Sequence, residues 1–174
     1  NSTVVVGCYI HGCAGAGIAA SGANPQNAII NNIIANNTGK GIHISTAANA
    51  TMQGPTIYGN TIYGNGDSGY EATDTDTFGL VMNNIFSQNG NAAGEYNIEA
   101  AGGELHGYHA YNVLYHSGGG GGANLSGVTA NSTELTSDPT MTNPASGDFS
   151  LQTGSPALQA GFPGFLGING GTGY

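Results

Sequence analysis

Short blocks in which two asparagines flank an apolar run recur along the chain, and this recurrence constrains the fold more than any other feature. The blocks are NIIANN (32–37), NTIYGN (60–65) and NIFSQN (84–89), and in each the second asparagine follows the first by five positions. NVLYHS (112–117) keeps the first asparagine, and GCYIHG (7–12) keeps only the apolar middle. Successive blocks start 25, 28, 24 and 28 residues apart, a spacing that indicates one supersecondary unit per repeat.

A second set of short segments follows the first at a similar period. The segments are GIAA (17–20), GIHI (41–44), GYEA (69–72) and NIEA (97–100). The period of two in a strand places their second and fourth residues on an inner face. The third residues then point outward, and these are Ala19, His43, Glu71 and Glu99. Each repeat is therefore predicted to carry at least two short strands separated by Asn/Gly turns.

Repeats of this length with short strands are typical of a solenoid, in which each coil contacts only its neighbours. The chain lacks the leucine scaffold of leucine-rich repeats, and its glycine and β-branched content disfavours helical repeats. We therefore predict an all-β parallel β-helix whose coils stack about 4.8 Å apart. An asparagine at the same corner of every coil can pass an amide hydrogen bond to the next coil and tolerates a left-handed backbone. The alternative, in which asparagine merely marks loops, does not explain the fixed offset from the apolar residues.

Residues 137–161 differ in character and read SDPTMTNPASGDFSLQTGSPALQAG. This segment resembles a C-terminal signature of right-handed parallel β-helix proteins of the pectate-lyase-like superfamily. The matching residues are Asp138, Pro139, Asn143, Pro144, Gly147, Asp148, Phe149, Leu151, Ser155, Pro156, Ala157, Ala160 and Gly161. The resemblance implies a right-handed solenoid of about five coils with a C-terminal cap, in which Phe149 and Leu151 alternate into the core. It occurs in secreted polysaccharide-active enzymes, in cell-surface adhesins and in phage virion and tailspike proteins.

These features divide the chain into three predicted parts. Residues 1–117 form the β-helix coils, residues 118–136 are a Gly-rich connection, and residues 137–174 are a final coil and C-terminal cap.

The composition excludes some classes of partner. The chain has one cation, Lys40, against ten carboxylates, for a net charge of −9. Nucleic-acid binding is not expected, because it requires several basic side chains to neutralise phosphates. A membrane span is not expected either, since no apolar run reaches the roughly 18 residues that one requires. Only 6% of residues are charged, and such a polar, uncharged surface favours an extracellular or virion-surface location.

Cys8 and Cys13 are expected either to form a disulfide across a turn or to behave as two buried thiols.

The outward residues His43, Glu71 and Glu99 form the candidate ligand-facing column. If the coils stack in register, Glu71 and Glu99 lie on consecutive rungs, near the carboxylate separation of retaining glycosidases. The simpler interpretation is that outward strand positions are merely polar, and we assign no catalytic residue. A lyase acting on uronates needs cationic groups, and this chain offers only Lys40.

No metal site is predicted, although calcium stays open as an alternative for the acidic segment 66–77. Asp67, Glu71, Asp74 and Asp76 lie there without the spacing of a known calcium loop. His106, His109 and His116 cluster with tyrosines near the last coil, and their spacing does not match a zinc site.

The sequence thus favours a non-enzymatic module: an extracellular or virion-surface structural or adhesive β-helix of the phage decoration, fibre or spike type, which contacts glycans. Its expected partners are polysaccharide, other virion or cell-surface proteins, and copies of itself; the phage resemblance implies a homotrimer. The alternative is a polysaccharide lyase or glycoside hydrolase of the same superfamily.

Overall fold

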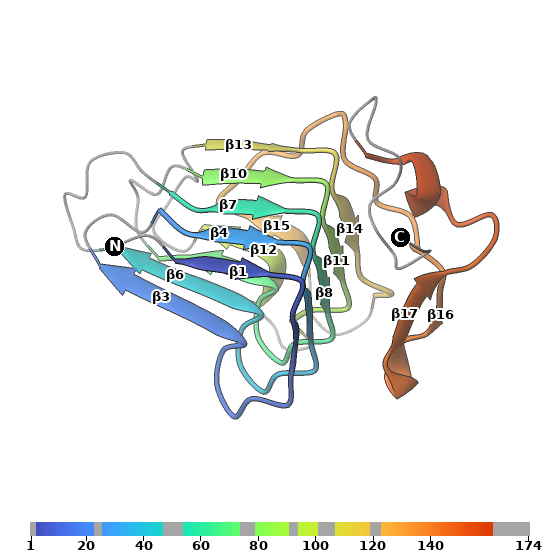
Figure 1. Cartoon of the computed structure of the whole chain (residues 1–174). Helices are drawn as coiled ribbons and strands as arrows, with labels where there is room; N and C mark the ends of the chain where they lie inside the picture. The colour runs from blue at the N-terminus through green and yellow to red at the C-terminus, as the bar shows by residue number, and fades with distance from the viewer. Residues whose placement is uncertain are drawn as a thin grey trace.

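Three parallel sheets, each of five strands, wind around one core in a computed structural model of the chain (Figure 1). The structure describes residues 3–22, 26–46, 54–73, 79–90, 94–100, 107–118 and 123–161. Sheet A contains β1 (Val4–Val6), β4 (Ala28–Ile30), β7 (Thr56–Tyr58), β10 (Gly79–Met82) and β13 (Gly107–Ala110). Sheet B contains β2 (Tyr9–His11), β5 (Ile33–Ala35), β8 (Thr61–Tyr63), β11 (Ile85–Ser87) and β14 (Val113–Tyr115). Sheet C contains β3 (Ile18–Gly22), β6 (Ile42–Thr46), β9 (Tyr70–Ala72), β12 (Tyr96–Ala100) and β15 (Ala123–Ser126).

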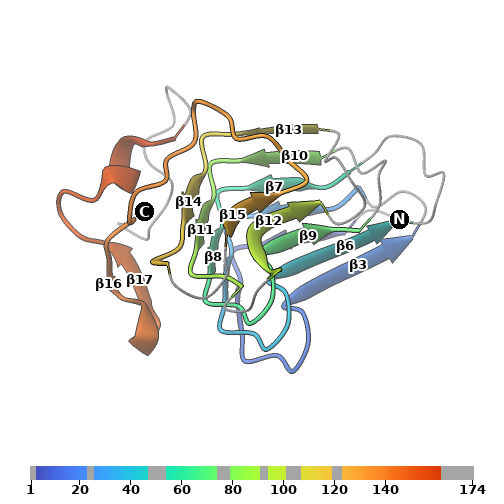
Figure 2. The same cartoon turned by 180° about the vertical axis from the view of Figure 1, so that it is seen from behind.

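Each coil contributes one strand to each sheet, so the predicted parallel solenoid is confirmed. Figure 1 shows the strands of sheet A stacked in chain order from β1 to β13, and Figure 2 shows the strands of sheet C stacked in the order β3, β6, β9 and β12. The pairing also confirms most of the repeat alignment, since Ile33 pairs with Thr61 and Thr61 with Ile85. One alignment was wrong by a residue. Tyr9 pairs with Ile33, so Cys8, rather than Gly7, occupies the position of Asn32 in the first coil.

The core is a stack of inward apolar side chains from all three sheets. Its members with at most 1% exposure include Ile29, Ile57, Val81, Ile34, Ile62, Phe86, Leu114, Ile42, Ile44, Tyr70 and Ile98. Residues at one strand position stack on their counterparts in the next coil, as Ile29 does on Ile57. Burying one such side chain contributes about 1.5–3 kcal/mol, which gives an almost uncharged chain its cohesion.

The first asparagine of each block forms a buried ladder along the corner between sheets A and B. The side-chain amide of Asn60 donates to Oδ1 of Asn84 at 2.9 Å, and the amide of Asn84 donates to Oδ1 of Asn112 at 3.0 Å. Asn32 donates to Asn60 in the same way at 3.0 Å. Each rung is also tied to the preceding coil, as when Asn84 Nδ2 donates to the Ile57 carbonyl at 2.9 Å. The predicted ladder is confirmed.

The second asparagine of each block forms a parallel ladder at the next corner. Asn37 donates to Asn65 at 2.9 Å and Asn65 to Asn89 at 2.8 Å. The ladder then shifts into sheet C, where Asn89 donates to Asn97 at 3.0 Å and Asn97 to Asn124 at 2.9 Å. Cysteines begin both ladders, because the backbone N–H groups of Cys8 and Cys13 donate to the first asparagine of each. Both thiols are free, with Cys8 exposed and Cys13 half-buried, so the expectation of a disulfide or of two buried thiols was wrong.

The left-handed backbone at these corners lies one residue before the ladder positions, so its predicted assignment to the ladder asparagines was wrong. Positive φ angles occur at Asn31 (54°), Asn36 (53°) and Asn83 (57°), while glycine takes the same corner positions at Gly59 and Gly64. Asparagine and glycine adopt this conformation at least cost, while Gln88 and Tyr111, each with a φ of 57°, take the same corner positions in later coils. The ladder asparagine itself is left free to direct its amide along the stack.

The C-terminal segment covers the outer surface of sheet B. An antiparallel hairpin of β16 (Met141–Asn143) and β17 (Asp148–Leu151) encloses the 3-10 turn η1 (Pro144–Ser146), and a second turn, η2 (Pro156–Gln159), follows. Met141, Phe149 and Leu151 pack against Ile85 and Val113 in a second apolar cluster. Both views show the hairpin beside sheet B (Figures 1 and 2).

The middle of the chain differs from the predicted connection. Residues 123–126, placed there within a Gly-rich linker, form β15 and continue sheet C. Leu135 forms a parallel bridge with Val113 and so begins a sixth turn. Residues 141–151 form a hairpin packed on the side of the solenoid rather than a further coil.

Candidate functional site

The outer face of sheet C carries the predicted column. His43 pairs in register with Glu71, and Glu71 pairs with Glu99. The strand alternation places the flanking residues Ile42, Ile44 and Ile98 in the core. The three side chains therefore stand on consecutive rungs, while their binding of a ligand stays a prediction.

Glu71 is the most enclosed member of the column, with only 8% of the residue exposed. Its Oε2 atom lies 3.3 Å from Lys40 Nζ and 3.4 Å from His43 Nε2. Lys40 Nζ also lies 3.6 Å from Asp67 Oδ2. Desolvation lowers the pKa of Lys40, but the attraction of Glu71, Asp67 and Glu95 outweighs it and leaves the pKa above its usual value. The only cation of the chain is thus committed to intramolecular carboxylates.

Glu99 is held by a different partner. Ser68 donates its hydroxyl to Glu99 Oε2 at 2.5 Å, and Ser68 Oγ also lies 3.1 Å from Glu95 Oε2. The hydroxyl oxygen in turn accepts from the backbone of Tyr96 at 3.0 Å. Neighbouring carboxylates on sheet C are therefore held by separate contacts, Glu71 by Lys40 and His43 and Glu99 by Ser68.

The charge of this face limits what it can bind. Asp67 and Glu71 contact the Lys40 ammonium group, and two further carboxylates, those of Glu95 and Glu99, are held nearby on this face by Ser68. Such an excess of negative charge repels polyuronates and other polyanions. Carboxylates and hydroxyls at fixed positions can instead accept hydrogen bonds from neutral sugars or pair with amino sugars.

The calcium alternative is not supported by a preformed cluster. Within the described ranges, no group of three His, Cys, Asp or Glu residues has an arrangement that could hold a metal ion. Asp67 and Glu71 both contact Lys40, whereas Asp74 and Asp76 lie outside the described residues. Calcium binding therefore stays an untested expectation.

Two of the three C-terminal histidines, His109 and His116, lie in different parts of the coil. His109 occupies the inward column of sheet A, paired with Val81, and His116 follows β14 in sheet B. His106 lies outside the described residues. Among the neighbouring tyrosines, Tyr108 is half exposed on the outer face of sheet A.

Several residues of the site were not predicted, although the sequence contained a signal for them. Lys40, Ser68 and Glu95 are linked to the column by contacts between adjacent coils. Ser68 lies one 28-residue repeat after Lys40, the same spacing that relates His43 to Glu71. Reading the repeat three or four residues before each member of the column would have found these positions.

Comparison with known proteins agrees with the geometry. A family model described as a right handed beta helix region matches residues 1–60. No curated protein and no solved structure matches the chain. In the part of the chain that the structure describes, no helix is long and apolar enough to cross a membrane. The matched residues and the coils that follow them share one continuous stack, so the chain has the fold of the right-handed parallel β-helix proteins.

Proposed function

We propose that this protein is a structural and adhesive β-helix module that acts outside the cell or on the surface of a virion. The observation that carries the proposal is the pair of buried asparagine ladders, which tie the coils together through uncharged amides. A scaffold held by backbone pairing and buried amides needs neither metal nor cofactor to stay rigid. Rigidity of this kind suits a display or fibre element.

We assign the outer face of sheet C as the surface that contacts glycans. Glu99 presents a half-buried carboxylate that the fully buried Ser68 holds in place, and His43 lies two rungs away in the same column. The negative charge around Lys40 favours neutral or amino sugars over uronates. Contact with other virion or cell-surface proteins would use the same exposed polar positions.

We also propose that copies of the chain associate through the outer face of sheet A. Its outward residues include Val4, Val6, Ile30, Leu80, Met82 and Tyr108. Val4 is 67% exposed, Val6 52% and Tyr108 50%. These six positions carry no charge. On a chain of net charge −9, two copies meet with least repulsion at such a face.

The enzymatic alternative rests on one observation, the placement of Glu71 and Glu99 on consecutive rungs. This alternative would make the protein a polysaccharide lyase or glycoside hydrolase. The contacts of Lys40 with Glu71 and of Ser68 with Glu99 count against it, because both carboxylates are already engaged.

A polysaccharide panel separates the two functions. We expect no new reducing or unsaturated ends after incubation with pectin, alginate, chitosan, neutral glucans and bacterial capsules. We expect measurable binding to neutral or amino-sugar polymers, weakened by Glu99→Gln and unchanged by Asp148→Asn, an exposed acid on the hairpin. Product formation that disappears in Glu71→Gln or Glu99→Gln would replace the adhesive function by an enzymatic one.

Self-association is tested by light scattering of the chain in solution. Leu80→Glu places a charge on the outer face of sheet A and should convert an oligomer to a monomer, whereas Thr142→Glu on the hairpin should not. A wild-type chain that is monomeric at all accessible concentrations contradicts the assignment of this face, and an oligomer of three would agree with the stoichiometry that the sequence resemblance implies.

A further inference from the structure

The first asparagine ladder ends on a carboxylate. Leu135 bridges Val113, so Glu134 occupies the position that Asn112, Asn84 and Asn60 occupy in earlier coils. Asn112 Nδ2 lies 3.4 Å from Glu134 Oε1. Each side-chain amide in the ladder donates to the next asparagine toward the C-terminal end, as well as to a carbonyl of the preceding coil. A carboxylate, which only accepts hydrogen bonds and carries a negative charge, is therefore well suited to end the ladder.

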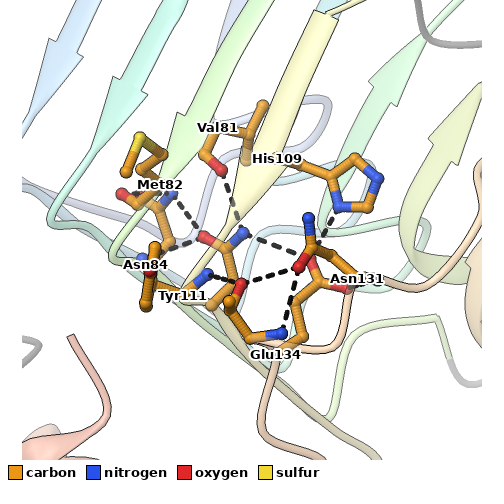
Figure 3. A network of polar contacts seen from close by, with 9 residues as sticks. Val81, Met82, Asn84, His109, Tyr111, Asn131 and Glu134 are labelled. Atoms are coloured by element: carbon orange, nitrogen blue, oxygen red, sulfur yellow. Dashed lines mark hydrogen bonds and ion pairs between the residues drawn. The ribbon is translucent and has the colours of Figure 1, made fainter. Parts of the chain in front are cut away.

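The partner of this carboxylate comes from the core. His109 stands in the inward column of sheet A, where Val81 and Ile57 precede it. Its Nδ1 atom lies 2.7 Å from Glu134 Oε1, and the two side chains are only 12% and 2% exposed. Figure 3 shows the His109 imidazole directed toward the Glu134 carboxylate, whose Oε1 atom also accepts from the Asn112 amide.

The turn that carries Glu134 is itself well ordered by hydrogen bonds. Asn131 N donates to Glu134 Oε2 at 3.0 Å, and the Asn131 side chain accepts from Thr133 N at 3.0 Å. Leu135 N donates to the Asn112 carbonyl at 2.9 Å, and Leu114 N donates to the Leu135 carbonyl at 2.8 Å. This turn is the first part of the chain that leaves the five coils and leads to the hairpin over sheet B.

We propose that the His109–Glu134 pair is a pH-dependent attachment that fastens the turn 131–135, and the C-terminal segment behind it, to the end of the solenoid. The imidazole has two acceptors, the Glu134 carboxylate and the Thr129 backbone. A protonated ring carries two N–H donors and a neutral ring only one, so deprotonation leaves one acceptor without its donor. Glu134 is the charged group placed against the ring, while its neighbours Val81 and Asn112 are uncharged.

The direction of the pH dependence follows from these contacts. The hydrogen bond to Glu134 raises the pKa of His109 above its ordinary value of 6.5, and this effect outweighs the desolvation that lowers it. A raised folded-state pKa stabilises the attachment fully below pH 6.5 and less as pH rises through the folded-state value. Above pH 6.5 the equilibrium constant for local opening should rise by up to about tenfold per pH unit until the folded-state pKa is passed.

Amide hydrogen exchange of the full chain from pH 6 to pH 9 tests this proposal. After correction for intrinsic exchange rates, the Leu114 and Leu135 amides should lose protection as pH rises, while the Ile42 amide in the middle of the stack should not. His109→Gln should remove the pH dependence, and His43→Gln, which alters the other His–Glu contact, should preserve it.

If His109→Gln does not fold, an NMR titration of wild-type His109 decides instead, and a midpoint at or below 6.5 overturns the proposal. Equal pH dependence in wild type and His109→Gln overturns it as well.

Discussion

Asn84 illustrates how one residue joins three coils. Its Oδ1 atom accepts from Asn60 N and Nδ2, both at 2.9 Å, and its Nδ2 atom donates to Ile57 O and to Asn112 Oδ1. The residue is fully buried. A side chain with both a donor and an acceptor is needed here, because each asparagine accepts hydrogen bonds from the coil before it and donates one to the coil after it.

Asn84→Ala should therefore be among the most destabilising substitutions in the chain. It leaves buried donors of Asn60 and the Ile57 carbonyl unpaired, and each such group costs about 1–3 kcal/mol. We expect the free energy of unfolding in urea to fall by roughly 3 kcal/mol or more. Asn143→Ala, at an exposed asparagine without a side-chain cap contact, is the control and should change stability little. Similar losses in both variants would show that the ladder does not contribute as argued.

Tyr70 places a hydroxyl group in the apolar core. Its side chain is fully buried in the column between Ile42 and Ile98, and among the described residues its hydroxyl has no hydrogen-bond partner. Burial raises the pKa of this phenol above its usual range. A buried hydroxyl without a partner costs about 1–3 kcal/mol.

Tyr70→Phe should accordingly raise the thermal unfolding midpoint. The substitution removes the unpaired hydroxyl and keeps the ring that packs in the core. Tyr108→Phe, at a half-exposed tyrosine, should leave the midpoint nearly unchanged. Calorimetry of the two variants and the wild type measures the difference, and a lower midpoint for Tyr70→Phe would indicate that an ordered water or another group satisfies the hydroxyl.

Single residues also show which contacts a sequence can reveal. The ladder columns were predictable because Asn32, Asn60 and Asn84 repeat the same residue type at one coil spacing. Glu134 was not predictable as the next rung, because it changes the residue type and follows Asn112 after only 22 positions. The burial of Glu71 was missed for a related reason, since alternation places a side chain on the outer face but does not show that Lys40 covers it.

The hairpin is the element that most alters the surface of the solenoid. Its Phe149 ring makes edge contacts with Tyr63 and Tyr9, with ring centroids 5.5 and 6.1 Å apart. Phe149 is 4% exposed and Leu151 5%. The predicted inward alternation of these two residues is confirmed, but the cluster they enter lies between the hairpin and sheet B rather than inside the coils. The sequence motif specified the strand and its buried face without specifying the surface that it packs on.

Phe149→Ala should loosen the hairpin without unfolding the coils. Truncating a buried Phe costs about 3–5 kcal/mol, and here that cost falls on the contact between hairpin and sheet B. We expect faster proteolysis within 141–151, increased binding of an apolar dye and a far-UV circular dichroism spectrum close to that of wild type. Tyr108→Ala removes an aromatic ring from an exposed position and should show none of these changes. Loss of the β-sheet signal in Phe149→Ala would mean that hairpin and coils unfold as one unit.

At the scale of the whole molecule, the stack is a linear series in which each coil pairs only with the coils before and after it. In sheet B, for example, β8 pairs with β5 and with β11. Interfaces between neighbouring coils repeat the same partners, an asparagine rung at the corner and apolar residues inside. In such an architecture, stability is close to a sum over coils and their interfaces. The fold therefore does not fix the number of coils.

Deletion of residues 60–83 tests this modularity directly. The deletion removes the 24 positions between Asn60 and Asn84 and joins Gly59 to Asn84, so that Asn32 can donate to Asn84 in place of Asn60. We expect a folded chain with a parallel β spectrum and a lower unfolding midpoint, because one interface between coils is lost. Deletion of residues 60–80 removes nearly the same mass but leaves the ladder position three residues out of register. A strand that is out of register by an odd number of residues directs its core side chains outward, so we expect that this variant does not fold. If both deletions fold equally well, the register of the asparagine column does not determine how the coils stack.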